Sequence, residues 1–416
     1  MMRIDICGYD SPVHNGGPLE WLMRMPEEFR ERGLDCRILL FGWAPKDECI
    51  AYQYFKANNF QVHFADFQDT HTNVRWLLQQ AQNDTPAIFV ANHVVPAYYA
   101  AGFLKQSGVA TVGVIRSDDG FYHGLINQFC SRKNHWAPTA VACVSEFLRE
   151  QVIRANSLAP NQCRTIPSGA IIPAETAAPK GKKFRALYAG RLCFEQKQAL
   201  KMVQALHFAK QATPNLEVEL IGDGNAVSAI KDYIEQENID WIKLRGALPT
   251  KAVRNAMLSS HCHVLLSDYE GTPMAVMEAM SCGLPPICLS TRSGISDLIT
   301  SGESGIIVED REQSFSDAVR QLSQDDALWR KLSTAARAKA ETEFSVNACA
   351  NKWLALFQDI APPPETIKRP ELPKKLRLLA PEPNFKRQDY RLPQGYQWHK
   401  SRLYTTLRRI KRKLGT

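Results

Sequence analysis

The sequence predicts an α/β protein in which two doubly wound, Rossmann-like domains face each other across a cleft and a basic tail follows. Three observations predict the two domains and the tail. Apolar, β-rich runs alternate with segments of helical periodicity, which is typical of parallel sheets covered on both faces. The alternation breaks at residues 173–183, and the composition changes again at residue 361.

The first domain is expected over residues 1–173. Its predicted strands are MRIDICGY (2–9), DCRILLFG (35–42), TPAIFVANH (85–93), ATVGVIRSDD (110–119) and TAVACVSEF (139–147). The opening run contains acids and no small-residue cleavage site, so we expect the first strand of a fold and no signal peptide. Gly16 and Gly17 precede a helical segment, where the backbone can approach a phosphate closely, although a glycine pair equally forms a plain turn.

The second domain is expected over residues 174–344, after a linker, PAETAAPKGKK, that lacks an apolar period. Its predicted strands are FRALYAGRL (184–192), LEVELIGDG (216–224), IKLRGAL (242–248), CHVLLSDYEG (262–271), LPPICLST (284–291) and SGIIVED (304–310). Residues 345–360 are expected to form a further helix. Because doubly wound sheets bind ligands beyond the carboxyl ends of their strands, we expect the active site in the cleft between the domains.

The net charge of +8 is concentrated in the tail. Residues 361–416 carry 15 Lys and Arg against four Asp and Glu, whereas the rest of the chain carries 36 basic and 39 acidic residues. The body therefore gives no reason to expect a nucleic-acid partner. No apolar run is long enough to predict a transmembrane helix. The 11 cysteines are scattered without a CxxC pair, which favours buried free thiols in a reducing, cytoplasmic compartment.

The tail, residues 361–416, holds 8 of the 24 prolines, and its first part, APPPETIKRPELPKK, is expected to be extended or disordered. Residues 400–416 place Leu403, Leu407, Ile410 and Leu414 on one face of a basic helix. Two interpretations stay open. The helix docks on an anionic membrane surface, which would make a cytoplasmic protein peripheral to the membrane, or it is a solvated tail or a partner-binding helix.

The stretch DYEGTPMAVMEAMSCG (268–283) carries the main functional signal. Thr272 is a good N-cap, Pro273 suits the first helical position, and Gly283 ends the helix, so we expect a helix over residues 273–282. Its N-terminal amides and dipole would face the cleft, where they favour a phosphate.

Glu278 lies inside this apolar helix without a cation three or four residues away. The carboxylate therefore has either a longer-range salt bridge, partial exposure, or a ligand diol such as a ribose as its partner. Arg191 and Lys197 follow the strand at 184–189, and two fixed cations there suit a pyrophosphate. Gly222 lies at another strand end. Each signal alone is weak, because cations in loops are usually solvated.

Together these pieces resemble the retaining GT-B glycosyltransferases of family four, the glycosyl transferases group 1 type. The matching pieces are Gly16-Gly17, VSEFLRE (144–150), IPSGAIIP (166–173), AGRLCFEQK (189–197), IGDG (221–224) and EGTPMAVMEAMSCGLP (270–285). Glu270 and Glu278 stand as the family's E-x7-E pair. The resemblance covers about residues 1–360, with ordered motifs in the C-terminal half and a looser match in the N-terminal half.

The resemblance implies how a nucleotide sugar, with UDP or GDP as its nucleotide, is held. Arg191 and Lys197 would neutralise the diphosphate and the charge that develops on it as it leaves. Glu278 would bind the ribose hydroxyls, and Arg245 lies where the family's base-contacting loop falls. Gly222 belongs to the glycine-rich strand end of the same donor site.

The resemblance also implies where the sugar reacts. Glu270 would contact its hydroxyls, and Gly271, Thr272 and Pro273 would meet sugar and phosphate through backbone amides. Transfer would retain the anomeric configuration, with same-face attack assisted by the leaving phosphate and without a cofactor or metal. The helix at 345–360 would cross back to the N-terminal domain.

One position departs from the family pattern. Many members carry a His after the strand ATVGVI, where it contacts the donor sugar, and this chain has Arg116 followed by Ser117, Asp118 and Asp119. Arginine does not accept a proton at neutral pH. Three alternatives stay open: Arg116 contacts the sugar or an anionic acceptor, Asp118 takes over the role of the family's His, or the donor chemistry differs. His93 ends another strand and faces either the cleft or the ordinary core.

The sequence thus predicts a glycosyltransferase that moves a sugar from a nucleotide sugar to a glycan, lipid-linked or small-molecule acceptor in polysaccharide or glycolipid assembly. Two alternatives remain: a nucleotide-sugar epimerase, and a non-catalytic partner in a glycan-assembly complex, which the departure at Arg116 motivates. The ordered motifs favour transfer. His261 and His263 flank Cys262, but no second ligand cluster lies nearby in sequence, so no metal site is expected there.

Overall fold

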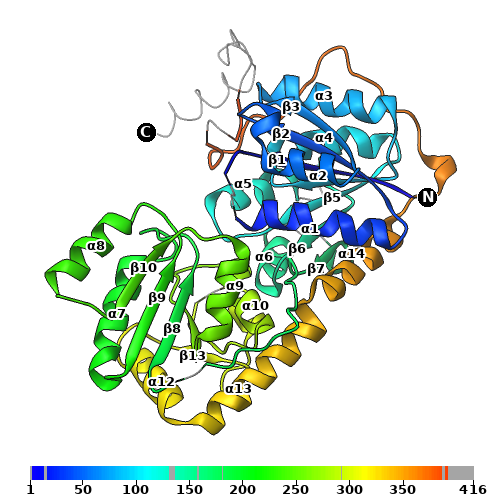
Figure 1. Cartoon of the computed structure of the whole chain (residues 1–416). Helices are drawn as coiled ribbons and strands as arrows, with labels where there is room; N and C mark the ends of the chain where they lie inside the picture. Colours follow the sequence, from blue (N-terminus) through cyan, green and yellow to red (C-terminus); the bar gives the residue numbers. More distant parts are fainter. Residues whose placement is uncertain are drawn as a thin grey trace.

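Two parallel sheets, each packed between helices, form two domains, and a C-terminal segment returns to the first of them (Figure 1). The computed structural model of the chain describes residues 2–13, 16–130, 136–156, 159–179, 181–291, 293–386 and 389–391. Buried apolar clusters line both faces of each sheet. The predicted fold class is therefore confirmed.

The N-terminal sheet has seven strands in the order β3-β2-β1-β4-β5-β6-β7. The strands are β1 (Arg3–Asp10), β2 (Asp35–Gly42), β3 (Gln61–Asp66), β4 (Ile88–Asn92), β5 (Ala110–Ile115), β6 (Ala140–Cys143) and β7 (Cys163–Thr165). The helices are α1 (Gly17–Glu31), α2 (Ile50–Ala57), α3 (Thr70–Asn83), α4 (Val95–Gln106), α5 (Gly120–Phe129) and α6 (Glu146–Asn156). The sequence analysis missed β3 and β7, because β3 is a partly exposed edge strand and β7 has three residues.

The C-terminal sheet has six strands in the order β10-β9-β8-β11-β12-β13. The strands are β8 (Phe184–Ala189), β9 (Leu216–Ile221), β10 (Ile242–Gly246), β11 (Cys262–Leu265), β12 (Pro286–Leu289) and β13 (Ile306–Val308). The helices are α7 (Ala199–Ala212), α8 (Val227–Gln236), α9 (Thr250–Ser259), α10 (Met274–Ser281), α11 (Ile295–Leu298), α12 (Gln313–Gln324) and α13 (Asp326–Lys339). In Figure 1, α9 and α10 are the helices of this domain drawn next to the N-terminal domain.

Helix α14 (Val346–Ile360) carries the chain back to the N-terminal domain. Ser345 caps the helix, because its hydroxyl accepts a hydrogen bond from the Ala348 amide at 3.1 Å. Trp353 packs against Trp21 of α1, with ring centroids 5.1 Å apart, and lies in the same buried cluster as strands β1 and β4. The helix that follows the second domain therefore completes the core of the first.

The described part of the segment after residue 361 is largely extended and packs on the N-terminal domain, so of the two expectations, extended or disordered, the structure shows the extended one there. A Cβ atom at Gly108 would lie 2.4 Å from the Thr366 carbonyl oxygen, and one at Gly124 would lie 2.7 Å from the Phe385 ring. Partly buried apolar residues of the segment contact the core cluster around α3, α4 and α5. The packed side chains explain how a proline-rich segment stays on the surface of the domain. Residues 400–416, where a basic helix is expected, lie outside the described residues.

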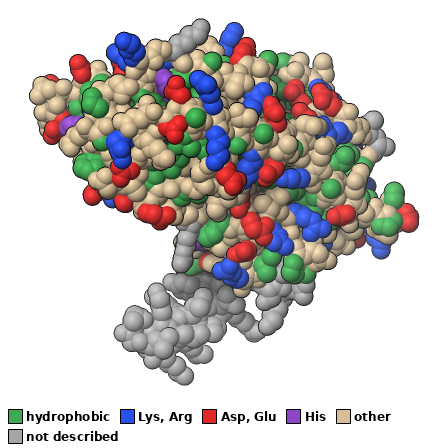
Figure 2. Space-filling model, turned by 90° about the horizontal axis from the view of Figure 1, so that it is seen from below, with side chains coloured by type: hydrophobic (Ala, Val, Ile, Leu, Met, Phe, Trp, Pro, Cys, Tyr) green, Lys and Arg blue, Asp and Glu red, His purple; other side chains and the backbone are tan. Residues whose placement is uncertain are grey.

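All 11 cysteines are free and buried, as expected. Within the described ranges, no helix combines the length and the apolar character needed to cross a bilayer. Figure 2 shows that Lys and Arg are interspersed with Asp and Glu on the face of the molecule seen from below. This mixture agrees with the near-neutral balance of the chain before residue 361.

Candidate active site

The loops after β8 and β9 are held together by direct backbone contact. A Cβ atom at Gly222 would lie 1.9 Å from the Gly190 carbonyl oxygen, and one at Gly224 would lie 2.3 Å from that of Leu192. Gly222 has φ +138°, a conformation that L side chains rarely adopt. Gly222 therefore fixes the position of the loop that carries Arg191.

Lys197 and Glu270 form an ion pair at the carboxyl end of the C-terminal sheet. Their side chains are 14% and 6% exposed, so solvent screens the pair weakly. Gln196 joins this pair to Arg191: its amide nitrogen donates to Glu270 Oε2 at 3.3 Å, and its oxygen accepts from Arg191 Nη2 at 2.8 Å. The sequence-predicted residues Arg191, Lys197 and Glu270 thus belong to one network, and the sequence analysis missed Gln196.

Arg191 is exposed, and no described carboxylate pairs with it. An anion can reach this guanidinium without displacing an internal partner. Lys197 differs, because its ammonium already has the Glu270 carboxylate beside it. An arriving diphosphate would share Lys197 with Glu270 and meet Arg191 directly.

The loop Glu270–Pro273 runs along the N-terminal domain. A Cβ atom at Gly271 would lie 1.9 Å from the Arg116 carbonyl oxygen, so only glycine fits there. The Thr272 hydroxyl donates to the Val144 carbonyl at 2.5 Å. The prediction that Thr272 caps the helix is therefore wrong: its hydroxyl is used across the domain interface, and Pro273 is the N-cap of α10, which begins at Met274.

The N-termini of α1 and α10 meet at the cleft. A Cβ atom at Gly17, the first residue of α1, would lie 3.5 Å from the Met274 side chain at the start of α10. The N-cap residues Gly16 and Pro273 make no side-chain capping hydrogen bond among the described residues. Two sets of helix N-terminal amides, each at the positive end of a dipole, therefore converge on the same side of the cleft.

Glu278 lies on α10 and has a partner in the other domain. Its Oε1 is 3.2 Å from Nη2 of Arg24 on α1, and the same guanidinium is 2.9 Å from Glu20. Burial raises the pKa of Glu278 above its usual range, although Arg24 opposes this rise. Of the alternatives considered from the sequence, the longer-range salt bridge and partial exposure are both present, because the Glu278 side chain is 29% exposed; a ribose as partner stays a prediction.

A cavity of about 110 Å³ opens between the domains beside Glu278. Both domains line it, with Glu20, Arg24, Ile171, Leu248, Thr250, Val253, Arg254, Met257, Glu278, Ser281 and Cys282. Arg245 is not among these residues. Its exposed guanidinium pairs with Glu219 of β9 at 3.2 Å, and the carbonyl of the neighbouring Gly246 accepts from the Gly222 amide at 2.9 Å, so a role of Arg245 in base contact stays a prediction.

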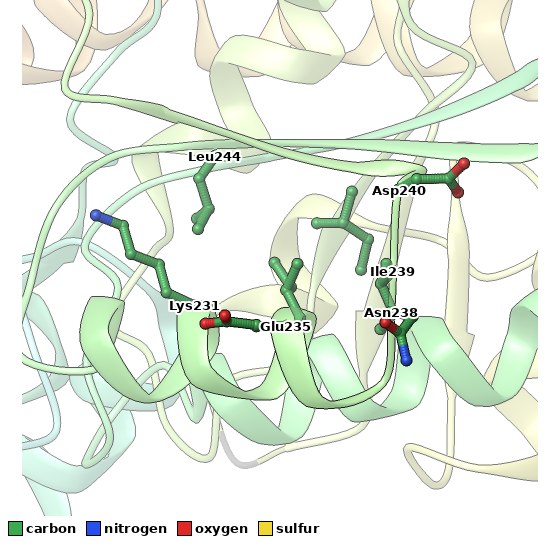
Figure 3. Close-up of a pocket in the computed structure, with 8 residues that line it drawn as sticks. Lys231, Glu235, Asn238, Ile239, Asp240 and Leu244 are labelled. Carbon is green, nitrogen blue, oxygen red and sulfur yellow. The ribbon is translucent and has the colours of Figure 1, made fainter.

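A larger hollow of about 420 Å³ lies away from the candidate residues, at the outer edge of the C-terminal domain (Figure 3). The side chains around it come from α8, from β10 and from the connection between them, and none is a sequence-predicted site residue. We therefore place the active site at the cleft beside Glu278 and not in the larger hollow.

Arg116 follows β5 and is 8% exposed. Its Nε donates to Asn92 at 2.8 Å, Nη1 donates to Ser168 at 3.1 Å, and its guanidinium lies 4.6 Å from the centroid of the Trp21 ring. Nη2 has no hydrogen-bond partner among the described residues. Burial lowers the pKa of Arg116 to about 10, so the side chain stays charged at neutral pH.

Asp118 is held away from Arg116. Its carboxylate is 2.7 Å from His123 Nε2 and accepts from Gln151 Nε2 at 3.0 Å. His93 lies near the same loop: its Nδ1 is 2.8 Å from the Tyr122 hydroxyl, and burial lowers its pKa to about 4. Neutral His93 is thus oriented by Tyr122.

Aromatic side chains gather where β1 to β4 end, which the sequence analysis did not recognise. They are Tyr9, Trp43, Phe67, His93 and Phe121. Tyr9 contacts Trp43, Phe67 and His93, Trp43 also contacts Phe67, and His93 contacts Phe121, with ring centroids 4.5–6.2 Å apart. Their positions in the sequence could have revealed the cluster, because four of the five residues lie at or directly after the end of a strand.

No cluster of three or more metal-ligating side chains occurs in the part of the chain that the structure describes. His263, beside Cys262, is buried in strand β11, and burial lowers its pKa to about 3. The expectation that no metal binds stays a prediction.

Comparison with known proteins identifies the C-terminal domain. Residues 173–339 match the family model described as glycosyl transferases group 1. Amylovoran biosynthesis glycosyltransferase AmsK of Erwinia amylovora is 31% identical over 167 residues, which are 38% of this chain and 41% of AmsK. The chain thus spans less than half the length of this relative. Lipopolysaccharide 1,6-galactosyltransferase of Escherichia coli is 24% identical over 73% of this chain and 84% of its own length.

Solved structures share the fold at low sequence identity. The Staphylococcus aureus protein TarM, determined with UDP, α-GlcNAc-glycerol and fondaparinux, has a TM-score of 0.69 at 13% identity and covers 86% of this chain and 100% of its own. Anabaena HepE, determined with UDP and glucose, has a TM-score of 0.69 at 17% identity with the same coverage.

Proposed function

We propose that this chain, which has the GT-B fold and whose C-terminal domain belongs to the glycosyl transferases group 1 family, transfers a sugar from a nucleoside diphosphate sugar to an acceptor. The observation that carries the proposal is the convergence of the α1 and α10 N-termini beside the Lys197–Glu270 pair. Helix N-termini and fixed cations together are suited to a diphosphate.

The diphosphate is the leaving group, so its negative charge grows as the bond to the sugar breaks. Preorganised donors at that place stabilise the transition state more than the ground state. Arg191 is open to the ligand, Lys197 is fixed by Glu270, and the amides that follow Gly16 and Pro273 have no side-chain cap. These groups supply the stabilisation in our account, with UDP or GDP as the nucleotide.

The nucleoside is placed in the cavity beside Glu278. The carboxylate accepts hydrogen bonds from the ribose hydroxyls, while Arg24 keeps its contact with Glu20. Ile171, Leu248 and Val253 provide apolar surface for the base. We assign base contact to this surface and not to Arg245, which the structure holds on Glu219.

The sugar then lies between Glu270 and Arg116, because Gly271 contacts the backbone of Arg116. We propose transfer with retention, in which the acceptor hydroxyl attacks on the face from which the diphosphate leaves and gives its proton to the leaving phosphate. In this scheme no side chain acts as the base. Arg116 therefore fits as a contact to the sugar.

The names of relatives support a role in glycan assembly. They include amylovoran biosynthesis, lipopolysaccharide galactosyltransfer and the glycosylation of poly(ribitol-phosphate). We propose a glycan or lipid-linked acceptor, with the tail at 400–416 on an anionic membrane surface. The alternative of a non-catalytic partner is supported only by Arg116 in place of the family's His, and no observation favours an epimerase.

The test is release of UDP or GDP from a panel of nucleotide sugars by the wild-type protein and by Glu278→Ala and Arg191→Ala. We expect release from at least one member of the panel and a strong loss in both variants. If the wild type releases nucleotide from none, the proposed function is wrong; if neither variant loses activity or affinity, the site is wrongly placed.

A further inference from the structure

The aromatic cluster of Tyr9, Trp43, Phe67, His93 and Phe121 includes one residue that the core does not require. Trp43 is 49% exposed, although its ring packs in a tilted arrangement against Tyr9, with a centroid distance of 4.8 Å, and against Phe67, with 5.1 Å. Phe41 already packs against Phe67 from the core, and Trp76 packs in turn against Phe41. One face of the cluster is therefore open, with a large indole at its edge.

Asp119 places this cluster beside the donor loop. The carboxylate of Asp119 accepts from the Tyr122 amide at 3.2 Å, next to Phe121. Burial, and then the charge of Asp119, raise the pKa of Tyr269, the residue that precedes Glu270. Asp119 also lies close enough to His93 to oppose the lowering of its pKa by burial. A Cβ atom at Gly271 in the donor loop would lie 3.2 Å from the Cα atom of Ser117, two residues before Asp119, so the loop that leads to Phe121 contacts the donor loop.

The C-terminal segment completes the rim of the cluster. Arg391 lies over the Phe67 ring, with its guanidinium carbon 5.3 Å from the centroid. Its backbone is fixed to Thr70 at the start of α3 by two hydrogen bonds of 2.8 and 3.0 Å. The charges of Asp389 and Arg391 both act on the Tyr9 hydroxyl, which is buried without a partner among the described residues.

We propose that this cluster, with Arg391 at its rim, is the subsite that binds a sugar ring of the acceptor; the proposal rests on the function proposed above. A sugar ring presents C–H groups on its faces and hydroxyls around its edge. The open indole of Trp43 and the ring of Tyr9 suit the faces, and Asp119, His93 and Arg391 offer polar groups for the edge.

Position and chemistry both favour an acceptor sugar as the occupant. The cluster lies at the carboxyl ends of the N-terminal strands, opposite the charged donor groups, where the second substrate of a transfer must approach. Aromatic faces with few fixed charges suit a neutral ring better than a nucleotide. Segment 389–391 therefore adds an element of acceptor recognition from outside the two-domain body.

The test measures binding of the full chain, saturated with UDP, to a printed array of bacterial oligosaccharides. We compare wild type with Trp43→Ala, Trp43→Phe and the control Phe208→Ala, which removes a similarly exposed ring from α7. We expect wild type and Phe208→Ala to bind the same glycans, Trp43→Ala to bind them about tenfold or more weakly, and Trp43→Phe to retain most of the affinity.

Two outcomes overturn the proposal: no glycan bound by the wild type, or unchanged glycan binding by Trp43→Ala. UDP affinity and slow hydrolysis of a UDP-sugar without acceptor are measured in every variant. Because Trp43 lies outside the donor groups, both should stay at the wild-type level. If the wild type neither binds UDP nor hydrolyses the UDP-sugar, the proposed function itself is wrong. If it does both and Trp43→Ala binds glycans normally, only the acceptor-subsite proposal is wrong.

Discussion

The two sides of the cleft present different kinds of surface. The C-terminal side presents Arg191, Lys197, Glu270 and Glu278, which are fixed through hydrogen bonds and ion pairs. The N-terminal side presents packed aromatic rings, with the exposed indole of Trp43 at their edge. The difference follows from the ligands we assign to them: a leaving diphosphate requires fixed charge, whereas a sugar ring requires a flat apolar surface.

The largest effect is expected from breaking the Lys197–Glu270 pair. Lys197→Met removes a cation from the diphosphate, so turnover should fall about 10²–10³-fold. The substitution also leaves Glu270 buried and unpaired, which should lower the free energy of unfolding by about 3–5 kcal/mol. Initial rates with a nucleotide sugar and chemical denaturation measure the two effects.

The matched control is Lys183→Met, which breaks the exposed Lys183–Glu217 pair. That variant should keep its rate and lose at most about 1 kcal/mol. The double variant Lys197→Met/Glu270→Gln separates the contribution of Lys197 to turnover from its contribution to stability, because it should recover stability without recovering turnover. If Lys197→Met and Lys183→Met had equal effects on turnover and stability, the proposed role of the Lys197–Glu270 pair in holding the diphosphate would be wrong.

Glu278→Ala is expected to weaken UDP binding by about 2–3 kcal/mol, since it removes hydrogen bonds from a charged acceptor to the ribose. The fold should tolerate the change, because Arg24 retains Glu20 at 2.9 Å. Isothermal titration calorimetry measures the affinity. Glu341→Ala, which removes an exposed carboxylate paired with Arg337, serves as the control and should bind UDP normally. Unchanged affinity in Glu278→Ala would contradict the ribose assignment.

The pH dependence of UDP binding sharpens the same assignment. Burial raises the pKa of Glu278, and the charged form accepts the ribose hydrogen bonds. Affinity should therefore be constant above this raised pKa and fall as the pH drops through it, beginning at a higher pH than for an ordinary glutamate. Arg24, Glu20 and Arg254 act on the same carboxylate, so the wild-type profile is compared with that of Glu278→Gln. The difference in UDP affinity between wild type and Glu278→Gln should vanish at low pH. If the two curves of affinity against pH ran parallel, the prediction would be wrong.

Arg116 is the exception on the aromatic side, and its removal should have the smallest effect on stability. Its partners Asn92, Ser168 and Trp21 are uncharged, so Arg116→Met replaces a buried charge that lacks a counter-ion. The free energy of unfolding should stay within about 1 kcal/mol of wild type, while turnover falls. Chemical denaturation measures the free energy of unfolding of Arg116→Met, and initial rates measure its turnover. A loss of several kcal/mol with unchanged turnover would make Arg116 a structural cross-link.

The candidates on the donor side were named from short motifs and from the family resemblance. Glu270 and Glu278 share one loop and helix, and Arg191 and Lys197 share another loop; the structure joins Arg191, Lys197 and Glu270 in one network, and their donor role stays a prediction. Their partners were not predictable, since Arg24 is 254 residues from Glu278. Thr272 was assigned to a cap for the same reason: its acceptor, Val144, is 128 residues away and outcompetes the helix end.

The aromatic side was not predictable because its members come from separate strand ends. Tyr9, Trp43, Phe67 and His93 are isolated residues in the sequence, and only the parallel order of β1 to β4 brings them together. The packing of the C-terminal segment was not predictable, because prolines and basic residues are typical of both solvated and packed extended chains. Its burial depends on Phe385 fitting against Gly124, which no local pattern reveals.

The most direct test of the donor site is an experimental structure of the protein with an unhydrolysed nucleotide sugar. We predict the ribose hydroxyls on the Glu278 carboxylate and the diphosphate within hydrogen-bonding distance of Arg191, Lys197 and the first amides of α10. A nucleotide bound elsewhere, such as the hollow between α8 and β10, with Glu278 still held only by Arg24, would contradict the account.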